Sequence, residues 1–141
     1  MEMKKPSILH GTCVDIKGSG VLIVGSSGAG KSSLAIGLIA LGAYLVADDQ
    51  CEIENVNNGL IISKPASLPK SIEMRGIGLV SVPMVNQTYL NLIVNMDEVE
   101  EARMPGKRFT EISGHKITTV FGKEMQDIAF RIYVLAKNNL S

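Results

Sequence analysis

The residues best suited to chemistry lie between Gly25 and Ser33, directly after a short apolar run. The pattern G-x-x-x-x-G-K-[S/T] is matched at every fixed position by Gly25-Ser26-Ser27-Gly28-Ala29-Gly30-Lys31-Ser32. Glycines let the backbone curl tightly enough for several N–H groups to point at one polyphosphate. The ammonium group of Lys31 then reaches the terminal phosphates, and the hydroxyl of Ser32 is placed to hold Mg²⁺. This stretch therefore predicts a nucleotide-binding phosphate loop.

The residues on either side predict the strand and the helix that a phosphate loop requires. Four apolar residues, 21–24, predict a buried strand before the loop. After the loop, Leu34, Leu38 and Leu41 repeat along one stripe of a helix that Gly42 ends. The alternative is a glycine- and serine-rich turn that binds nothing. Because the motif and its structural context coincide, we expect phosphate binding at the N-terminus of this helix.

Two adjacent acids, Asp48 and Asp49, close the next apolar run, 43–47. A carboxylate at a strand end beside a phosphate loop is where such proteins place the acid that helps to hold Mg²⁺. Two acids allow one to lie near the metal while the other accepts a proton from an incoming hydroxyl group. The alternative is an acidic turn before the hairpin that Asn57-Asn58-Gly59 predicts. Spacing alone does not decide which acid is the base.

Other charged residues are weaker candidates, and each has an ordinary structural explanation. His10 lies in an apolar run, where a histidine is more often structural than functional. Glu73 and Arg75 precede two glycines and could supply a metal ligand and a phosphate clamp, or could form a solvated turn. Lys107 and Arg108 fit a solvated loop, and the alternative is a patch that contacts a partner or a phosphate.

The composition limits the classes of protein to which the chain can belong. Its 141 residues are 45% hydrophobic and carry a formal net charge of +0, which predicts one globular domain spanning 1–141. No excess of positive charge points to nucleic acid, and no apolar run approaches the roughly 20 residues that span a bilayer. Residues 1–5 lack the apolar core of a signal peptide, so we expect a cytoplasmic protein. Cys13 and Cys51 lie in apolar contexts and are expected to be buried free thiols.

The remaining pattern predicts more strands than helices. Strands are expected over 7–15, 43–47, 51–54, 60–63, 89–96 and 117–120, besides the one that leads into the phosphate loop. A second helix at the C-terminus has one apolar face, formed by Met125, Ile128, Ala129, Ile132, Leu135 and Ala136. Because a doubly wound sheet would alternate strands and helices more regularly, we expect a mixed sheet with few helices, α/β or α+β by class.

These motifs in this order resemble the bacterial HPr kinase/phosphorylases. The resemblance rests on four stretches, 10–15 (HGTCVD), 25–32 (GSSGAGKS), 45–49 (LVADD) and 73–78 (EMRGIG), and it extends over roughly residues 7–120. It implies a P-loop-containing α/β fold of the phosphoenolpyruvate-carboxykinase type, commonly assembled as hexamers. It also implies transfer of phosphate from ATP to a serine of the small phosphocarrier HPr and, in many members, removal of that phosphate by phosphorolysis.

The resemblance implies roles in binding for individual residues. The loop from Gly25 to Ser33 would hold ATP, and Lys31 would bind and stabilise the transferred phosphate. Ser32 and Glu73 would ligate Mg²⁺. Glu73 lies in the signature loop of the family, which spans 72–81. ATP and Mg²⁺ are therefore the expected cofactors. The expected partners are an HPr-like phosphocarrier as substrate and further copies of the chain, whereas nucleic acid and membranes are not expected.

The resemblance also implies roles in catalysis. Asp49 would take the proton of the acceptor serine and act as the acid in the reverse reaction, with Asp48 as the adjacent alternative. His10 would lie beside that carboxylate and tune it, and Arg75 would help to organise the site. The sequence leaves open which phosphocarrier is the acceptor.

The chain departs from the family pattern in three ways. Full-length members carry a further N-terminal domain, so we expect a shortened form that consists of the catalytic part. The arginine-rich loop tied to dephosphorylation should lie near 120–125, which contains no arginine. The segment after Gly78 is shortened, and Arg103 and Arg108 are the nearest candidates for another arginine of the family. These departures favour kinase over phosphorylase activity.

The alternative functions are a regulatory module that senses ATP or phosphate without phosphotransfer, and a small-molecule kinase of related fold.

Overall fold

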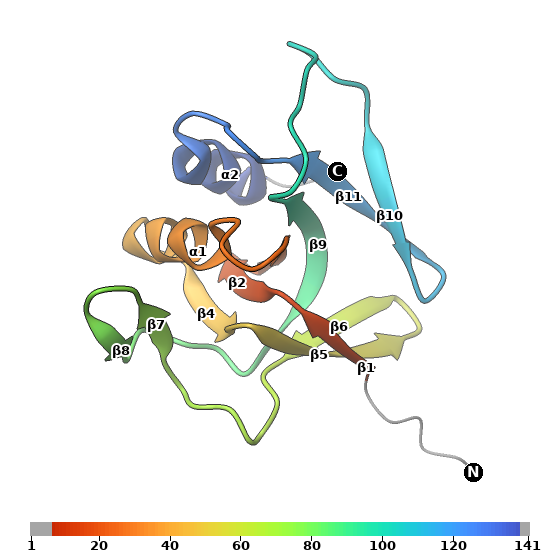
Figure 1. The fold of residues 1–141 in the computed structure, drawn as a ribbon. Coiled ribbons are helices and arrows are strands. Elements are labelled where there is room, and N and C mark those ends of the chain that lie inside the picture. Colours follow the sequence, from red (N-terminus) through yellow and green to blue (C-terminus); the bar gives the residue numbers. More distant parts are fainter. Residues whose placement is uncertain (1–6, 139–141) are drawn as a thin grey trace.

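A computed structural model of the chain describes residues 7–138, and Figure 1 shows their arrangement as a ribbon. The first strands are β1 (Ser7–His10), β2 (Thr12–Ile16) and β3 (Ser19–Val24), followed by helix α1 (Lys31–Ala40). Next come β4 (Tyr44–Ala47), β5 (Gln50–Val56), β6 (Gly59–Ser63), β7 (Ile72–Met74), β8 (Gly78–Val80) and β9 (Gln87–Asn95). The chain then forms β10 (Arg108–Ile112), β11 (His115–Phe121) and helix α2 (Ile128–Lys137). No helix in this described range is long and apolar enough to cross a membrane.

Strand β9 lies at the centre of a nine-stranded sheet whose main order is β1-β5-β6-β9-β3-β2-β4. Its first residues pair antiparallel with β6, and its later residues pair parallel with β3 and with β11. β10 pairs with β11, whereas β7 and β8 form a separate hairpin. Because β3 and β9 are parallel neighbours, their carboxyl ends, at Val24 and Asn95, lie side by side. The loops that follow these two strands therefore meet at one edge of the sheet.

The sheet carries apolar side chains on both faces, and they alternate along the central strands as the pleat requires. In β3, Val21 and Ile23 belong to the cluster that includes the helices, whereas Leu22 belongs to a second cluster with β5 and β6. In β9, Leu92 and Ile93 divide between the same two clusters. The central strands are therefore buried on both faces, which holds the ends of β3 and β9 in place.

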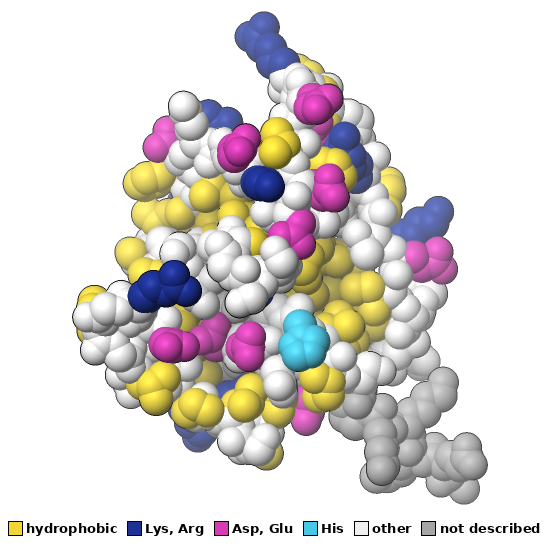
Figure 2. Space-filling model, in the orientation of Figure 1, with side chains coloured by type: hydrophobic (Ala, Val, Ile, Leu, Met, Phe, Trp, Pro, Cys, Tyr) yellow, Lys and Arg dark blue, Asp and Glu magenta, His cyan; other side chains and the backbone are white. Residues whose placement is uncertain are grey.

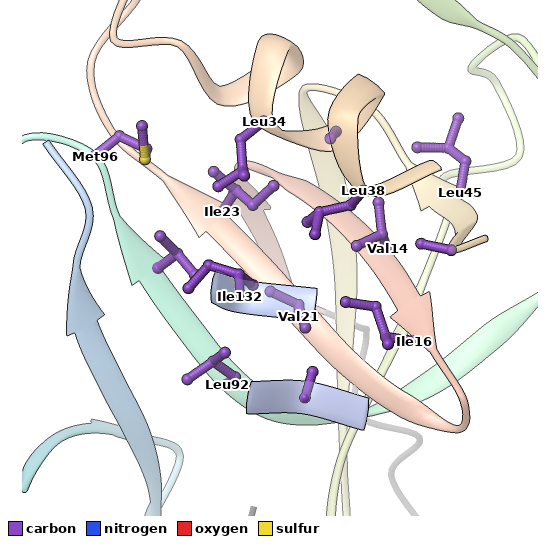
Figure 3. Close-up of a cluster of buried hydrophobic side chains, with 14 of the residues drawn as sticks. Val14, Ile16, Val21, Ile23, Leu34, Leu38, Leu45, Leu92, Met96 and Ile132 are labelled. Carbon is purple, nitrogen blue, oxygen red and sulfur yellow. The ribbon is translucent and has the colours of Figure 1, made fainter. Parts of the chain in front are cut away.

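The two helices cover one face of the sheet (Figure 1). Figure 3 shows Leu34 and Leu38 of α1 and Ile132 of α2 in one buried cluster with side chains of the sheet. A Cβ atom at Gly37 would lie 2.9 Å from the Cβ of Ala129, so the glycine permits the close approach of α1 to α2. This packing fixes α1, whose first residue is the lysine of the phosphate loop.

The mixed α/β architecture expected from the sequence is confirmed, as are the helix after the loop and the hairpin formed by β5 and β6. Both cysteines are buried free thiols, as expected. The prediction of one strand over 7–15 is wrong, because the chain breaks at Gly11 into β1, which pairs with β5, and β2, which pairs with β3 and β4. A Cβ atom at Gly11 would lie 2.8 Å from the carbonyl oxygen of Ile23, so this crossing needs a glycine.

Four details of the fold differ from the sequence-based expectations. Residues 73–80 form most of the hairpin β7–β8, and Arg108 begins β10. These strands are short and largely exposed, so they lack the alternation of apolar residues that predicts a strand. Helix α2 begins only at Ile128, so Met125 lies before it. Leu135 is 38% exposed because it lies at the edge of the stripe on which Ile132 is buried.

Candidate active site

The loop between β3 and α1 has the shape of a phosphate cradle. Gly28 and Gly30 have φ angles of 84° and 98°, a left-handed conformation that favours glycine, so the backbone requires the glycines of the motif. Helix α1 begins at Lys31, whose Nζ donates to the carbonyl oxygens of Gly25 at 2.8 Å and Ser26 at 3.1 Å. The first turn of α1 contains no acidic residue to compete for its N–H groups. The loop and the helix therefore offer N–H donors and one ammonium group to an anion.

A cleft of about 460 Å³ opens over this loop. It is lined by His10, Thr12, Gly25, Ser27, Gly28, Gly30, Lys31, Ser32, Ser33, Ile36, Asp49, Glu73 and Arg75. In Figure 2 a histidine and several acidic side chains gather over the region where β1, α1 and the β7–β8 hairpin meet in Figure 1. The cleft thus joins the phosphate loop to charged side chains from segments that are far apart in the sequence.

The half-buried carboxylate of Asp48, just after β4, is held by three hydrogen bonds. Its Oδ1 accepts from Thr12 Oγ1 at 3.0 Å and from Ser32 Oγ at 3.4 Å. Its Oδ2 accepts from the backbone N–H of Glu73 at 3.4 Å. Asp48 therefore ties β2, the first turn of α1 and β7 together, and it lies beside the hydroxyl expected to hold Mg²⁺.

Asp49 has different surroundings from its neighbour. Its φ angle is 71°, a left-handed conformation that aspartate adopts more readily than most residues. Its backbone accepts from the N–H of Gly11 at 2.9 Å and donates to Thr12 Oγ1 at 3.4 Å. Its carboxylate lines the cleft, as His10 does, and forms no hydrogen bond or ion pair with residues 7–138. The Asp48 carboxylate is therefore held by three elements, whereas the Asp49 carboxylate has no such partner among residues 7–138.

The oxygen atoms near Ser32 fit a magnesium ion that binds together with phosphate. Mg²⁺ usually keeps several waters and takes one or two carboxylates besides phosphate oxygens. The Ser32 hydroxyl and the Asp48 carboxylate lie together, and Glu73 lines the same cleft. Within the described part of the chain, no group of three or more His, Cys, Asp and Glu side chains could hold a metal ion alone. These residues therefore fit an ion whose remaining ligands come from phosphate and water.

The structure brings most of the predicted site residues together. Eleven of the fourteen line the cleft, and the other three are Ser26, Ala29 and Asp48. Ser26 and Ala29 belong to the loop itself, and Asp48 contacts the lining through Ser32. The roles expected for these residues stay predictions.

Two residues near the site were given no role from the sequence. Thr12 lies within the 10–15 stretch, but only the fold shows that its hydroxyl bonds to Asp48 and to the N–H of Asp49. Asp97 follows the apolar strand β9, and its carboxylate accepts hydrogen bonds from the N–H and the hydroxyl of Ser26. The N–H bond, followed by the hydroxyl bond, lowers the pKa of Asp97 below its ordinary value. The sequence contained a pattern that could have marked Asp97 as a site residue, because Asp97 follows an apolar run as Asp48 does.

Arg103 and Arg108 do not line the cleft over the phosphate loop. Arg103 lines a second cavity, of about 520 Å³, near the segment 99–105, the end of β11 and α2. Arg108 forms an ion pair with Glu100, and its guanidinium carbon lies 4.1 Å from the centroid of the Phe121 ring. The interpretation of Arg108 as part of a solvated loop is wrong, because β10 begins there and holds the side chain against β11.

Comparisons with known proteins agree with this architecture. The model of the family described as HPr Serine kinase C-terminal domain matches residues 1–132. An HPr kinase/phosphorylase of Clostridium acetobutylicum is 33% identical over 124 residues, which cover 83% of this chain and 41% of that protein. The chain thus spans less than half the length of this relative. A solved structure of the Hpr(Ser) kinase/phosphatase from Coxiella burnetii matches with a TM-score of 0.79 and 28% identity, over 94% of this chain and 89% of that chain. Because the family model matches nearly the whole chain, the chain belongs to the HPr serine kinase C-terminal domain family.

Proposed function

We propose that this chain is an ATP- and Mg²⁺-dependent protein serine kinase whose substrate is an HPr-like phosphocarrier protein. The observation that carries the proposal is the free carboxylate of Asp49 in the same cleft as the phosphate loop. A kinase needs a phosphate cradle and a proton acceptor for the attacking hydroxyl within one site. The names of the two relatives, HPr kinase/phosphorylase and Hpr(Ser) kinase/phosphatase, supply the substrate.

In this proposal the loop Gly25–Ser33 holds the phosphates of ATP through its N–H groups and the N-terminus of α1. The Lys31 ammonium group has three N–H donors, and the loop carbonyls of Gly25 and Ser26 occupy two of them. The third would donate to a phosphate oxygen, where the charge of Lys31 stabilises the phosphoryl group in transfer. Ser32, Asp48 and Glu73 would hold Mg²⁺, which neutralises phosphate charge when it is bound. The Thr12 hydroxyl keeps the Asp48 carboxylate turned towards Ser32.

The transfer step requires one proton acceptor. Asp49 accepts the proton of the acceptor serine, the serine oxygen attacks the γ-phosphorus of ATP, and the bond from that phosphorus to the β–γ bridging oxygen breaks. The products are a phosphoserine and ADP. His10 would orient the Asp49 carboxylate, and Arg75 would clamp the phosphates. Removal of the phosphate by phosphorolysis would be a separate reaction, in which an oxygen of inorganic phosphate attacks the phosphorus of the phosphoserine and the bond from that phosphorus to the serine oxygen breaks. Asp49 would take the proton that inorganic phosphate loses and give a proton to the serine oxygen, and the products would be serine and pyrophosphate.

The test is incubation of the purified chain with Mg-ATP and an HPr-type phosphocarrier from the same genome. We expect intact-protein mass spectrometry to show a gain of one phosphoryl group, mapped to a serine. Lys31→Ala should abolish the gain, because the loop loses its ammonium group. Lys17→Ala should retain it, since Lys17 is exposed in the turn between β2 and β3, at the other end of β3. ATP binding without any phosphorylated protein would favour a regulatory module, and phosphate recovered in a metabolite would favour a small-molecule kinase.

The proposal extends to self-association, for which the family resemblance implies hexamers. Helix α2 leaves Phe130 and Val134 60% and 59% exposed. Apolar side chains exposed on one helix can pack between copies of a protein. Light scattering coupled to size-exclusion chromatography measures the mass of the particle in solution, and a monomer at micromolar concentration would contradict this part of the proposal.

A further inference from the structure

The segment that follows β9 is held against the first residues of the phosphate loop. Because β9 lies parallel to β3, the N–H of Met96 donates to the carbonyl oxygen of Val24 at 2.8 Å. The side-chain oxygen of Asn95 accepts from the N–H of Asp97 at 2.9 Å, which fixes the backbone where it leaves the strand. Asp97 thus reaches Ser26 across a separation of 71 residues in the sequence.

The carboxylate of Asp97 accepts three hydrogen bonds, all from Ser26. The Ser26 N–H lies 2.9 Å from Oδ1 and 2.9 Å from Oδ2, and the Ser26 hydroxyl lies 2.8 Å from Oδ1. The N–H bond and then the hydroxyl bond lower the pKa of Asp97, and the nearby charges of Lys31 and Lys123 act in the same direction. The carboxylate is therefore ionised at neutral pH, and an ionised acceptor makes the stronger kind of hydrogen bond.

The same peptide unit is held on its other side by Lys31. The carbonyl of Gly25 and the N–H of Ser26 belong to one planar peptide and point in opposite directions. Asp97 binds the N–H, and the Nζ of Lys31 binds the carbonyl oxygen at 2.8 Å. The peptide therefore lies between a carboxylate and an ammonium group, and it cannot turn over without breaking both contacts.

We propose that Asp97 is a positioning residue that fixes the Gly25–Ser26 peptide, and through it the ammonium group of Lys31, in the orientation that receives the phosphates of the nucleotide. This inference rests on the proposed function, because the nucleotide is the one that the kinase would bind. Asp97 is not among the residues that line the cleft. It therefore acts through the loop and not by touching phosphate. Without it, part of the free energy of binding would be used to order the loop.

The proposal predicts that removal of Asp97 weakens nucleotide binding, whereas the loss of its negative charge alone would strengthen it. Removal of a negative charge beside a phosphate site should strengthen the binding of an anion. Removal of the contact that orders the loop should weaken binding. Glu98 offers a matched control, because it is the next residue, it is exposed, and its side chain forms no hydrogen bond with the described residues. Its substitution removes the same charge and leaves the contact with Ser26 in place.

The first measurement compares Asp97→Ala with Glu98→Ala by calorimetric titration with Mg-ATP, with thermal unfolding to verify that each variant is folded. We expect Asp97→Ala to weaken binding roughly ten- to a hundredfold, the loss that corresponds to hydrogen bonds with a charged group. Glu98→Ala should bind as tightly as the wild type or slightly tighter. Asp97→Asn keeps one acceptor oxygen and should fall between, and it replaces Asp97→Ala if the latter does not fold. In phosphotransfer, most of the loss should appear in KM for ATP and little in kcat.

The second measurement follows the contact without nucleotide. The amide proton of Ser26 should exchange slowly with solvent in the wild type and quickly in Asp97→Ala, as monitored by NMR. Mg-ATP binding by Asp97→Ala that equals or exceeds that of Glu98→Ala would overturn the inference, and so would a Ser26 amide that exchanges equally fast in wild type and variant. A wild type that binds no Mg-ATP would overturn the proposed function and the positioning role together, even where the Ser26 amide depends on Asp97.

Discussion

Replacement of Thr12 by valine tests how the acids beside the phosphate loop are organised. Thr12 is 1% exposed, and its Oγ1 donates to Asp48 Oδ1 at 3.0 Å. The same Oδ1 accepts from Ser32 at 3.4 Å, so the threonine hydroxyl sets the direction of the carboxylate. Valine keeps the shape of threonine and removes only the hydroxyl group. The substitution therefore removes one of the three hydrogen bonds that hold the Asp48 carboxylate, together with the bond that Oγ1 accepts from the N–H of Asp49, without opening a cavity.

The expected loss of stability follows from the kind of bond. A hydrogen bond to a charged group contributes about 1.5–3 kcal/mol to the free energy of unfolding. For a chain of this length, each kcal/mol corresponds to about 2–4 °C in Tm, so Thr12→Val should lower Tm by roughly 3–12 °C. The chain offers a matched control in Thr88, which is 7% exposed and donates to Asp15 Oδ1 at 2.6 Å, away from the cleft. Thr88→Val should lose a similar amount of stability.

The two variants should differ in their need for magnesium. Residues that orient metal ligands typically cost 10–100-fold in metal affinity or activity when they are lost. We therefore expect Thr12→Val to require roughly 10–100-fold more Mg²⁺ for phosphorylation of the phosphocarrier at saturating ATP. Thr88→Val should have the Mg²⁺ requirement of the wild type. If both variants lose stability and neither changes its Mg²⁺ requirement, Thr12 does not orient a metal ligand and the reasoning is refuted.

Three further outcomes are expected. Asp49→Asn should lower kcat for phosphotransfer roughly 10²–10⁴-fold and leave the affinity for Mg-ATP nearly unchanged, because asparagine can keep the left-handed backbone and only the proton acceptor is lost. Unchanged transfer in a quench-flow assay would refute the role of Asp49 as the base. Gly37→Ala should lower the free energy of unfolding in urea by about 1–3 kcal/mol, because the new Cβ would lie 2.9 Å from that of Ala129. Gly106→Ala, in open space, should lower it far less, and equal losses would refute the packing argument. Burial above all raises the pKa of the Cys51 thiol from 9.0 to about 12, so its stabilising contribution is complete below pH 9.0 and is lost as the pH rises towards 12. Between pH 9.0 and 12 the urea midpoint of Cys51→Ala should then decline less steeply than that of the wild type. Parallel declines of the two midpoints would contradict the raised pKa of Cys51.

The phosphate loop could be predicted because its signal is local. Gly28 and Gly30 adopt left-handed conformations that few other residues tolerate, and Lys31 begins the helix that the apolar stripe predicts. The hairpin β5–β6 was predictable for the same reason, since its turn residues lie between two apolar runs. Such features depend on neighbours within a few residues of one another.

Features that depend on distant partners could not be predicted. Nothing local marks Gly11 as the point where the chain passes from β1 to β2, because the requirement comes from the carbonyl oxygen of Ile23. β10 carries Arg108 out of the expected loop because it pairs with β11, although few of its own residues are apolar. In each case the partner strand supplies the hydrogen bonds, and the local sequence has no pattern to show it.

The sequence by itself determined that a loop with the phosphate-binding motif would join a strand to a helix and that two acids would follow the next strand. Only the tertiary structure separated the acids, because Thr12, Ser32 and the backbone of Glu73 approach Asp48 from three different elements, whereas no described residue bonds to the Asp49 carboxylate. It also brought Asp97 to the loop, because β9 lies parallel to β3 and ends at the same edge of the sheet. Spacing along the chain specifies local backbone shape, whereas the surroundings of a carboxylate are set by residues that only the folded sheet brings within hydrogen-bonding distance.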